Sequence, residues 1–352
     1  MYPRIVIDIE KYRHNVRVLR EKLSEHNMSM MAVTKVFCAN QNLIDVLNEE
    51  QVDFIADSRL ENLKTMKTSI SKVLLRLPSL HAVQDVVRYA DISLNSEMKT
   101  IKALNDAAKK QGKRHKVIVM VDLGDLREGM YYKSDLQKTL LEIEAMEHIE
   151  LYGLGTNLTC HGGIIPRKPT LLKLVDILHA VEESIDRKLP VVSAGNSSHL
   201  HLLDDDIDIP TLNNLRIGEA IVLGRETAFG NKIKGLYDDV FTLETDIIEL
   251  KEKPSYPEGE IGMDAFGNKP TFVDQGPMKR AILAIGKQDV DHSELLPVDG
   301  CVELLGSSSD HVIANVGNAQ RNYDVGDVLQ FKLTYGSLLS LMTSPYVVKH
   351  YV

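Results

Sequence analysis

Polar side chains able to do chemistry follow several apolar runs of this sequence. They are Lys35 in "AVTK", Arg127 in "VDLGDLREG", Asn157 in "GLGTNLTC", Asn196 and Ser197 in "SAGNSSH", and Arg216 in "LRIGEA". Taken one at a time, each has an ordinary explanation. A lysine after a strand can be a solvated charge, the two arginines can be ion-paired scaffold residues, and "GNSS" can be a helix cap. The combination is harder to explain in this way.

Lys35 and the "GNSS" turn together suggest one cofactor. A lysine partly withdrawn from water has its charged form disfavoured, which leaves a neutral amine able to condense with an aldehyde. A turn of Ser and Gly residues at a helix start offers hydroxyl and backbone N–H groups to a phosphate. Pyridoxal 5′-phosphate is an aldehyde that carries a phosphate. The sequence therefore predicts Schiff-base chemistry on this cofactor.

The elements that carry these residues alternate between strand-like and helix-like patterns, which favours parallel strands joined by crossover helices. Eight runs are predicted as strands: Met30 to Thr34, Val52 to Ala56, Val73 to Leu77, Asp91 to Leu94, Val117 to Asp122, Leu151 to Thr156, Pro190 to Ala194, and the neighbours of Leu215. Apolar residues at helical spacing occur between them, as in Tyr12, Val16, Leu19 and Leu23. Eight such units fit a (β/α)8 barrel, whose chemistry gathers at the carboxyl ends of the strands. A doubly wound open sheet is the alternative, because periodicity does not show closure.

The pattern changes after Phe229. Short β-like segments follow, among them "DVFTLETDIIELKEKP", "RAILAIG", "HVIANV", "DVLQFKL" and "YVVKHYV". The segment from 252 to 277 is broken by proline and glycine and is predicted to be a loop. We therefore predict an α/β fold with a TIM-type barrel over residues 1–228, which binds pyridoxal phosphate, and a C-terminal mainly β domain over residues 229–352.

Composition excludes several classes of protein. Of 352 residues, 43% are hydrophobic and 26% are charged, as in ordinary globular proteins, and no apolar run reaches the ~20 residues of a membrane span. The first residues lack a secretory signal, and three scattered cysteines do not form a disulfide framework, so a cytoplasmic location is expected. A net charge of −9 argues against a nucleic-acid partner.

Two further groups of residues could suggest other chemistry. His199 and His201, beside the acidic run from 204 to 206, could be metal ligands. Residues i and i+2 point apart on a helix, so we predict no metal site. Cys160 beside His161 could suggest a thiol nucleophile, but adjacent side chains seldom face each other, so Cys160 is expected to be a packing residue.

These motifs resemble the alanine racemase family of pyridoxal-phosphate enzymes over nearly the whole chain. The resemblance begins at "IVIDIEKYRHNVRVLR" and implies a (β/α)8 barrel followed by a C-terminal β domain. It implies that Lys35 is the cofactor lysine. It also implies that Arg127 contacts the phenolic side of the cofactor or the substrate carboxylate, and that Asn157 replaces a ring-packing histidine.

The same resemblance assigns the rest of the cofactor site. Ser197, with Asn196, matches the phosphate-binding serine, and Gly218 lies near the phosphate. Arg216 would face the pyridine nitrogen. Tyr335 in "LTYGSLL" takes the position of a tyrosine that also binds the phosphate.

The departures from the family lie in the C-terminal part. The family's second catalytic base is a tyrosine supplied by the other subunit, and the equivalent segment here, "GEIGMDAFG", has Met263 or Asp264 in its place. Lys287 in "AIGKQD" replaces a second family tyrosine. Ser309 and Asp310 in "GSSSDH" replace a Met-Asp pair near the substrate carboxylate.

The motifs "TKVFCAN", "GTNLTC", "SAGNSSH" and "GMDAFG" are most similar to the ornithine racemase branch. This implies a homodimer that interconverts the L- and D-forms of a basic amino acid such as ornithine or lysine. Lys35 would serve one face of the Cα, and Asp264 or else Lys287 the other. Carboxylates among Asp264, Asp289 and Asp310 would attract a distal ammonium group.

Other activities of the same cofactor class stay open. They are an alanine or broad-specificity racemase, a D-amino-acid aldolase or dehydratase, and a non-catalytic carrier of pyridoxal phosphate. The carrier resembles the barrel alone, so the long C-terminal extension argues against it.

Overall fold

The computed structural model describes residues 1–205, 207 and 209–352. They form two compact units, one made of Glu10–Asp238 and the other of Met1–Ile9 together with Asp239–Val352. The units divide between Asp238 and Asp239, not between residues 228 and 229 as predicted, and Met1–Ile9 belong to the smaller unit and not to the barrel unit. The physical reason is that β1 (Arg4–Ile7) pairs with β11 (Phe241–Pro254) and with β17 (Val348–Tyr351).

The larger unit is a closed barrel. Within the described residues, its eight parallel strands are β2 (Ser29–Val33), β3 (Phe54–Asp57), β4 (Lys72–Leu74), β5 (Ile92–Asn95), β6 (His115–Asp122), β8 (Ile149–Gly155), β9 (Val191–Asn196) and β10 (Asn214–Ile217). Strand β10 pairs with β2, and β5 pairs with β6, so the sheet has no open edge. The predicted barrel is confirmed, and the open sheet is excluded.

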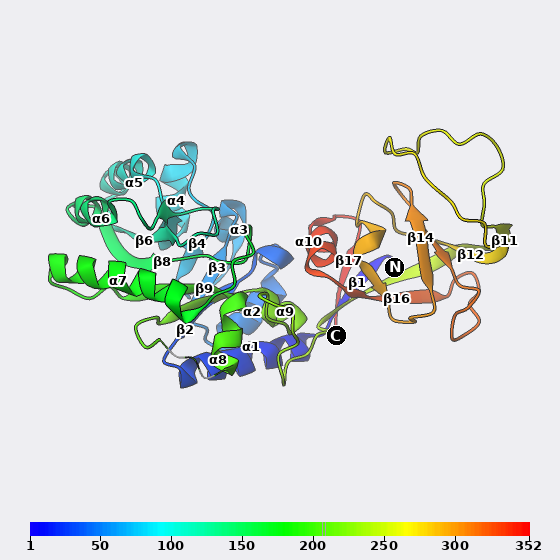
Figure 1. The fold of residues 1–352 in the computed structure, drawn as a ribbon, viewed down its shortest axis with the longest axis horizontal. Helices are drawn as coiled ribbons and strands as arrows, with labels where there is room; N and C mark the ends of the chain where they lie inside the picture. The colour runs from blue at the N-terminus through cyan, green and yellow to red at the C-terminus, as the bar shows by residue number, and fades with distance from the viewer. Residues whose placement is uncertain (206, 208) are drawn as a thin grey trace. The chain divides into compact units, whose positions relative to one another are not determined.

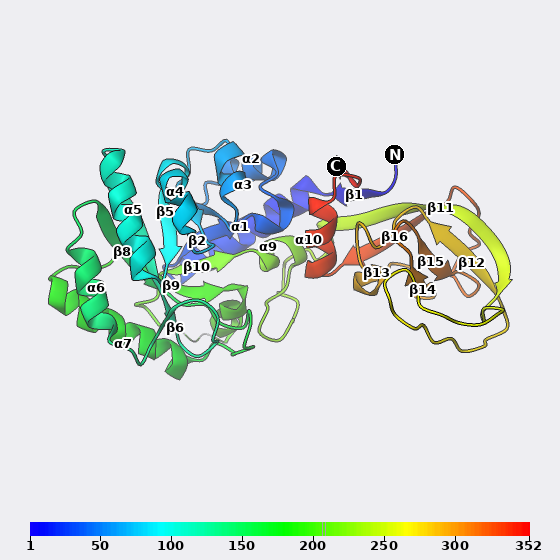
Figure 2. The same ribbon diagram turned by 90° about the horizontal axis from the view of Figure 1, so that it is seen from above.

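Helices cover the outside of the barrel, as Figures 1 and 2 show. They are α1 (Ile9–Glu25), α2 (Gln41–Glu49), α3 (Leu60–Thr65), α4 (Val83–Tyr89), α5 (Met98–Lys110), α6 (Leu136–Glu144), α7 (Lys168–Ile185), α8 (Leu200–Asp204) and α9 (Glu219–Leu223). The predicted stripe of Tyr12, Val16, Leu19 and Leu23 is buried on α1. Among the helices of the described residues, none has both the length and the apolar character needed to cross a bilayer.

Apolar side chains from the strands form one core cluster. They include Met31, Val33, Ala56, Val73, Ile92, Leu94, Ile118 and Met120. Burial of a large apolar side chain contributes roughly 1.5–3 kcal/mol. Because several strands contribute to the cluster, it holds their carboxyl ends in place relative to one another.

The smaller unit is a mainly antiparallel sheet. Besides β1, β11 and β17, its strands are β12 (Pro277–Leu283), β13 (Leu295–Pro297), β14 (Glu303–Ser307), β15 (Val312–Asn315) and β16 (Val328–Leu333). The five quoted segments correspond to β11, β12, β15, β16 and β17. The connection between β11 and β12 is the long loop predicted from proline and glycine, drawn in yellow in Figure 1. The helix α10 (Tyr335–Thr343) was not expected in this β-rich part.

Candidate active site

Lys35 lies directly after β2 and opens a short 3₁₀ turn, Lys35–Phe37. Its neighbour Thr34 is fully buried and donates from Oγ1 to Oδ2 of Asp57 at 2.6 Å. Asp57 ends β3 and also accepts from the backbone N of Arg59 at 2.7 Å and from Nδ2 of Asn62 at 3.0 Å. These bonds fix the backbone that carries Lys35. Across the described residues, the Lys35 ammonium itself has no hydrogen bond or ion pair.

Arg216 is buried inside the barrel at the level of Asn196, its partner in the β9–β10 register. Its Nη1 donates to Oγ of Ser193 at 2.6 Å, and its Nη2 donates to the carbonyl of Thr156 at 2.8 Å and to Oδ1 of Asn157 at 3.2 Å. Burial lowers the pKa of Arg216 to about 10, so the guanidinium stays charged at neutral pH. No carboxylate of the described chain forms an ion pair with it.

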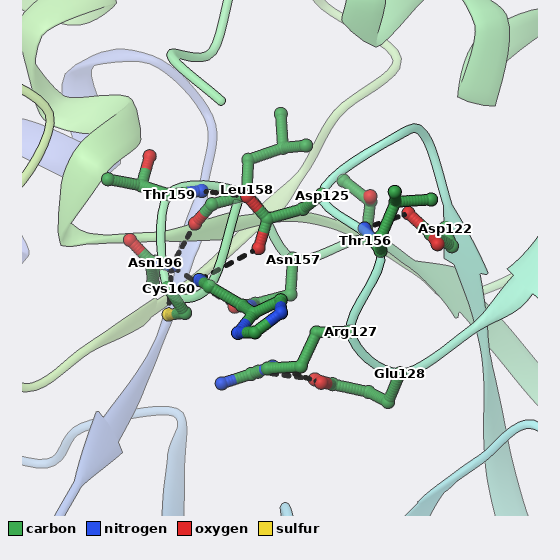
Figure 3. Close-up of polar contacts among 12 residues, drawn as sticks. Asp122, Asp125, Arg127, Glu128, Thr156, Asn157, Leu158, Thr159, Cys160 and Asn196 are labelled. Carbon is green, nitrogen blue, oxygen red and sulfur yellow. Dashed lines mark hydrogen bonds and ion pairs between the residues drawn. The ribbon is translucent and has the colours of Figure 1, made fainter. Parts of the chain in front are cut away.

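Asn196 connects the ends of β8 and β9. Its Nδ2 donates to Oδ1 of Asn157 at 3.1 Å, to the carbonyl of Leu158 at 3.0 Å and to Sγ of Cys160 at 3.3 Å, as Figure 3 shows. Its Oδ1 accepts from the backbone N of Ser198 at 2.8 Å. Cys160, expected to be a packing residue, is exposed and belongs to this network at the strand ends.

Arg127 forms a two-pronged ion pair with the adjacent carboxylate of Glu128, also visible in Figure 3. Burial opposes the charge of Arg127, but the hydrogen bonds from its guanidinium to Glu128 outweigh burial, and the pKa of Arg127 is raised. Both residues act electrostatically on Arg216. Arg127 and Arg216 therefore belong to one group of charges.

The loop after β8 is held by a buried carboxylate. Asp125 accepts backbone N–H groups from Thr159 at 3.0 Å, His161 at 3.1 Å and Ile164 at 3.2 Å. The contact of Asp125 with Thr159 is drawn in Figure 3. This anchoring places Cys160 and its neighbours in a defined loop rather than a flexible one.

Ser197 and Gly218 meet where β9 and β10 end. The backbone N of Ala220 donates to Oγ of Ser197 at 3.3 Å, which leaves the hydroxyl proton of Ser197 to be donated elsewhere. Gly218 caps α9, and a Cβ atom there would lie only 3.2 Å from the Cβ of Val33. The glycine thus lets the backbone of β10 pass close to β2.

Several side chains of this site did not stand out in the sequence. Asp57, Asp125, Glu128 and Glu219 are acidic residues at or near strand ends, the position that singled out the predicted residues. Burial raises the pKa of Glu219, while Arg225 and Lys35 oppose the rise, so Glu219 lies within electrostatic range of Lys35. Position after a strand was the available signal, but acids at such positions are also common in surface loops.

The donors of the barrel site fit a ligand that is anionic and rich in acceptors. Nδ2 of Asn157 and Oγ of Ser198 are buried without a hydrogen-bond partner in the described chain, and Arg216 contacts only neutral acceptors. Pyridoxal phosphate offers a phosphate, a phenolic oxygen and a ring nitrogen as acceptors, and an aldehyde for Lys35. Lys35, Arg127, Asn157, Asn196, Ser197, Arg216 and Gly218 are the residues that could hold it.

The predicted C-terminal residues form a second group within the smaller unit. The backbone N of Lys287 donates to the carbonyl of Ser308 at 2.9 Å, and Oγ of Ser309 donates to Oδ2 of Asp310 at 2.9 Å. A Cβ atom on Gly286 would lie 2.3 Å from the carbonyl oxygen of Ser309, so only glycine permits this approach. The segment of Lys287 therefore packs directly against that of Ser309 and Asp310.

Asp264 lies in the long loop and is exposed. Its carboxylate accepts from the backbone N of Phe266 at 2.9 Å and of Asn268 at 2.8 Å. The hydrogen bond from Asn268, then the one from Phe266, lowers the pKa of Asp264, and the nearby Lys287 lowers it further. The Lys287 ammonium lies 4.5 Å from the ring centre of Phe266 and 3.7 Å from Oδ2 of Asp291.

Two other predicted positions lie elsewhere. Tyr335 is the first residue of α10 and is partly buried in the smaller unit. Of the metal ligands considered, Nδ1 of His201 is 2.6 Å from the carbonyl of Ser198, and residue 206 lies outside the described residues. Among the described residues, no three His, Cys, Asp or Glu side chains are grouped to hold a metal ion.

Comparison with known proteins identifies the family of this chain. Residues 7–226 match the family described as alanine racemase, N-terminal domain. The chain is 49% identical over 350 residues to ornithine racemase from Acetoanaerobium sticklandii, covering 99% of each chain. It is 38% identical over 355 residues to lysine racemase from Thermotoga maritima, covering 100% of this chain and 99% of the other.

A solved structure shares the fold. Alanine racemase from Bartonella henselae with covalently bound pyridoxal phosphate matches with a TM-score of 0.75 and 17% sequence identity, covering 100% of both chains. The identity to ornithine racemase confirms the resemblance predicted from the motifs. The match over residues 7–226 shows that the chain belongs to the alanine racemase family.

Proposed function

We propose that this protein is a pyridoxal-phosphate-dependent racemase that inverts the Cα of a basic amino acid, with ornithine as its substrate. The observation that carries the proposal is a Lys35 amine at the same strand ends as a buried Arg216 guanidinium, with no ion-pair partner for either among the described residues. The similarity to ornithine racemase and lysine racemase over nearly the whole chain supports the reaction and the class of substrate.

The barrel residues have distinct tasks in this proposal. Lys35 would hold the cofactor, whose chemistry is to make the Cα proton of an attached amino acid acidic. The hydroxyl of Ser197 and the backbone at Gly218 would hold the phosphate, and Asn196 fixes the Ser197 turn through the backbone N of Ser198. Arg216 would face the ring nitrogen and, because it stays charged at neutral pH, would not readily give that nitrogen a proton.

Inversion requires an acid/base group on each face of the Cα. Lys35, once released from the cofactor, serves one face. For the other face, the contacts of Asp264 favour Lys287. The Asp264 carboxylate is occupied by two backbone N–H groups of its own loop, and these hydrogen bonds lower its pKa and so weaken it as a proton acceptor. In the described chain, the ammonium of Lys287 contacts the ring of Phe266 and a distant Asp291.

We propose that Lys287 comes from the second subunit of a homodimer, as the family resemblance implies. Mixing two inactive variants tests this arrangement. A dimer of one Lys35→Ala subunit and one Lys287→Ala subunit retains one site with both lysines, so mixed protein regains activity that neither variant has alone. If the two lysines act within one chain, mixing restores nothing.

A side chain with a distal ammonium fits the acidic residues near Lys287. A groove with a volume of about 500 Å³ in the smaller unit is lined by residues that include Lys287, Asp289, Asp291, Ser344 and Tyr346. Asp289 accepts from Oγ of Ser344 at 2.6 Å through Oδ1, which leaves its second oxygen available. Opposite charge at short range would favour ornithine over alanine.

The test of the proposed function uses circular dichroism of L-ornithine, L-lysine and L-alanine during incubation with the purified protein. The signal of ornithine should decay to zero fastest. Borohydride should fix the cofactor on Lys35, as peptide mapping would show, and Lys35→Ala should remain unlabelled. An unchanged signal with release of an aldehyde or loss of the amine would identify a lyase instead. A protein that takes up no cofactor would remove the proposal.

A further inference from the structure

The orientation of the Asn157 side-chain amide is fixed by its neighbours. Oδ1 of Asn157 accepts from Nη2 of Arg216 at 3.2 Å and from Nδ2 of Asn196 at 3.1 Å, the latter drawn in Figure 3. A guanidinium only donates. The Asn196 amide is also fixed, because its Nδ2 meets the carbonyl of Leu158 and its Oδ1 meets the backbone N of Ser198. If the Asn157 amide were flipped, its NH2 group would face the donors of Arg216 and Asn196, and neither hydrogen bond could form.

The opposite end of this amide is a buried donor without an acceptor. Asn157 is 6% exposed, and its Nδ2 has no hydrogen-bond partner in the described part of the chain. A buried N–H group that leaves water without a partner destabilises the folded protein. Such a group at the carboxyl ends of barrel strands is therefore expected to meet an acceptor that binds there.

The charge around Asn157 indicates what kind of acceptor this is. Arg216, in contact with Asn157, is a buried cation whose other hydrogen-bond partners in the described chain are the Ser193 hydroxyl and the Thr156 carbonyl. Nearby, Arg127 has its charge balanced by Glu128. The charge in direct contact with Asn157 is thus positive, which favours an anionic oxygen over a neutral one.

We propose that Nδ2 of Asn157 donates a hydrogen bond to an anionic oxygen of the molecules bound in the barrel, with Arg216 behind the amide polarising it. This role differs from the ring packing expected at this position from the family resemblance. It rests on the proposed function. Two sources carry the required chemistry: the cofactor, through its ionised phenolic oxygen or its phosphate, and the carboxylate of the amino acid.

The variant Asn157→Asp separates the two ends of the side chain. The aspartate has the size of asparagine and can accept from the same two donors, Arg216 and Asn196. Its negative charge lies beside Arg216. The cofactor-free variant should therefore be at least as stable to heat as the wild type. It lacks the donor. Asn157→Ala also lacks the donor but adds no charge. Asn105→Asp is a matched control on α5, where Oδ1 accepts from the backbone N of His148 at 3.0 Å.

Binding is measured by titrating cofactor-free protein with pyridoxal phosphate and following tyrosine fluorescence. Loss of a hydrogen bond to a charged group should weaken binding about 10- to 100-fold in both Asn157 variants and leave Asn105→Asp unchanged. This result assigns the acceptor to the cofactor. If cofactor affinity is unchanged but the KM for ornithine rises by a similar factor in both variants, the acceptor is the substrate carboxylate.

Other outcomes overturn the inference. Binding of cofactor and substrate within about twofold of the wild type in both variants would show that Nδ2 has no ligand, since a lost charged hydrogen bond exceeds that factor. Loss in Asn157→Asp alone would assign the effect to repulsion by the new charge. Loss only in proportion to lost heat stability would make Asn157 a structural residue. Failure of the wild type to bind pyridoxal phosphate would instead remove the proposed function.

Discussion

The two groups of candidate residues are held in opposite ways. In the barrel, Asn157, Asn196 and Arg216 are bonded to one another and largely withdrawn from water. In the smaller unit, Asp264 is exposed, and Lys287 is restrained by a ring and a weak ion pair. The barrel group is preorganised by the folding of one chain. The C-terminal group becomes a precise acid/base site only when something excludes water from it.

The charges of the barrel group are also more buried than those of the C-terminal group. Arg216 carries a charge among neutral groups, where a low dielectric strengthens its interaction with any ligand. The charges around Lys287 are exposed to solvent, which weakens them. Substitutions in the barrel should therefore affect binding and chemistry together. Substitution of Lys287 should affect the chemical step alone.

The largest expected effect is that of Lys35→Ala. Without the amine, neither attachment of the cofactor nor proton transfer on one face is available, so racemisation should fall by about 10³-fold or more. The measurement is the rate of loss of circular dichroism with L-ornithine. Lys99→Ala, at an exposed position of α5, is the control and should keep the wild-type rate. If Lys35→Ala inverted ornithine at an undiminished rate, the reactive residues would not be those of the barrel.

A smaller and more selective effect is expected for Lys287→Ala. Removal of a general acid/base reduces the rate about 10²- to 10⁴-fold, while Asp264→Asn should stay within about tenfold of the wild type. Exchange of the Cα proton with deuterated solvent gives the sharper readout. Lys287→Ala should still exchange the proton of one enantiomer, through Lys35, and lose exchange of the other. The reverse ranking of the two variants would assign the role to Asp264.

The strands, the helices and the polar residues at the strand ends could be predicted, because each depends on a local pattern in the sequence. Eight apolar runs of strand length, each followed by a helical stripe, indicate parallel strands covered by helices, because each unit can only bury its apolar face against its neighbours. Closure of these strands into a barrel was the part that the pattern left open. The reactive residues could be found from the same local pattern. Lys35, Asn157 and Ser197 immediately follow such runs, and the ends of parallel strands meet on one side of a barrel.

Features that depend on contacts between residues far apart in the chain were not predicted from the sequence. The strand β1 precedes the first barrel helix, yet it pairs with β17 near the other end of the chain. No local pattern contains that register. Likewise, the bond from Arg216 to Asn157 and the bond from Thr34 to Asp57 join residues far apart in sequence, so each residue alone looked like an ordinary polar side chain.

The barrel also contains a buried histidine that should make its stability sensitive to acid. His115 is buried on β6, 2.8 Å from Oγ of Ser93, and burial lowers its pKa to about 4. In the unfolded chain the pKa is 6.5, so between pH 6.5 and 4 the unfolded state binds more protons and the folded state loses stability as the pH falls. The difference amounts to roughly 3 kcal/mol. Stability above pH 6.5 is unaffected.

Urea unfolding at pH 7 and pH 5 checks this expectation with His115→Gln as the comparison. The variant should lose less stability between the two pH values than the wild type, because the glutamine does not titrate. Carboxylates titrate in both proteins and cancel in the difference. Equal pH dependence of the two proteins would contradict a buried neutral histidine.

The smallest effect is expected from loss of the Thr34–Asp57 hydrogen bond, which fixes the backbone next to Lys35. Thr34→Val keeps the side-chain shape but removes the donor to Asp57, whose buried Oδ2 then lacks that partner. An unsatisfied buried acceptor costs about 1–3 kcal/mol, so the free energy of unfolding should fall by that amount. If the Thr34–Asp57 bond orients the lysine, the variant should also react more slowly with pyridoxal phosphate in borohydride labelling of Lys35. Thr34→Ser restores the hydroxyl and should recover both the stability and the labelling rate. Lost stability with an unchanged labelling rate would mean that Asp57 stabilises the barrel without positioning Lys35. Lys35 and Lys287 would then differ in the burial of their surroundings and not in how firmly they are oriented.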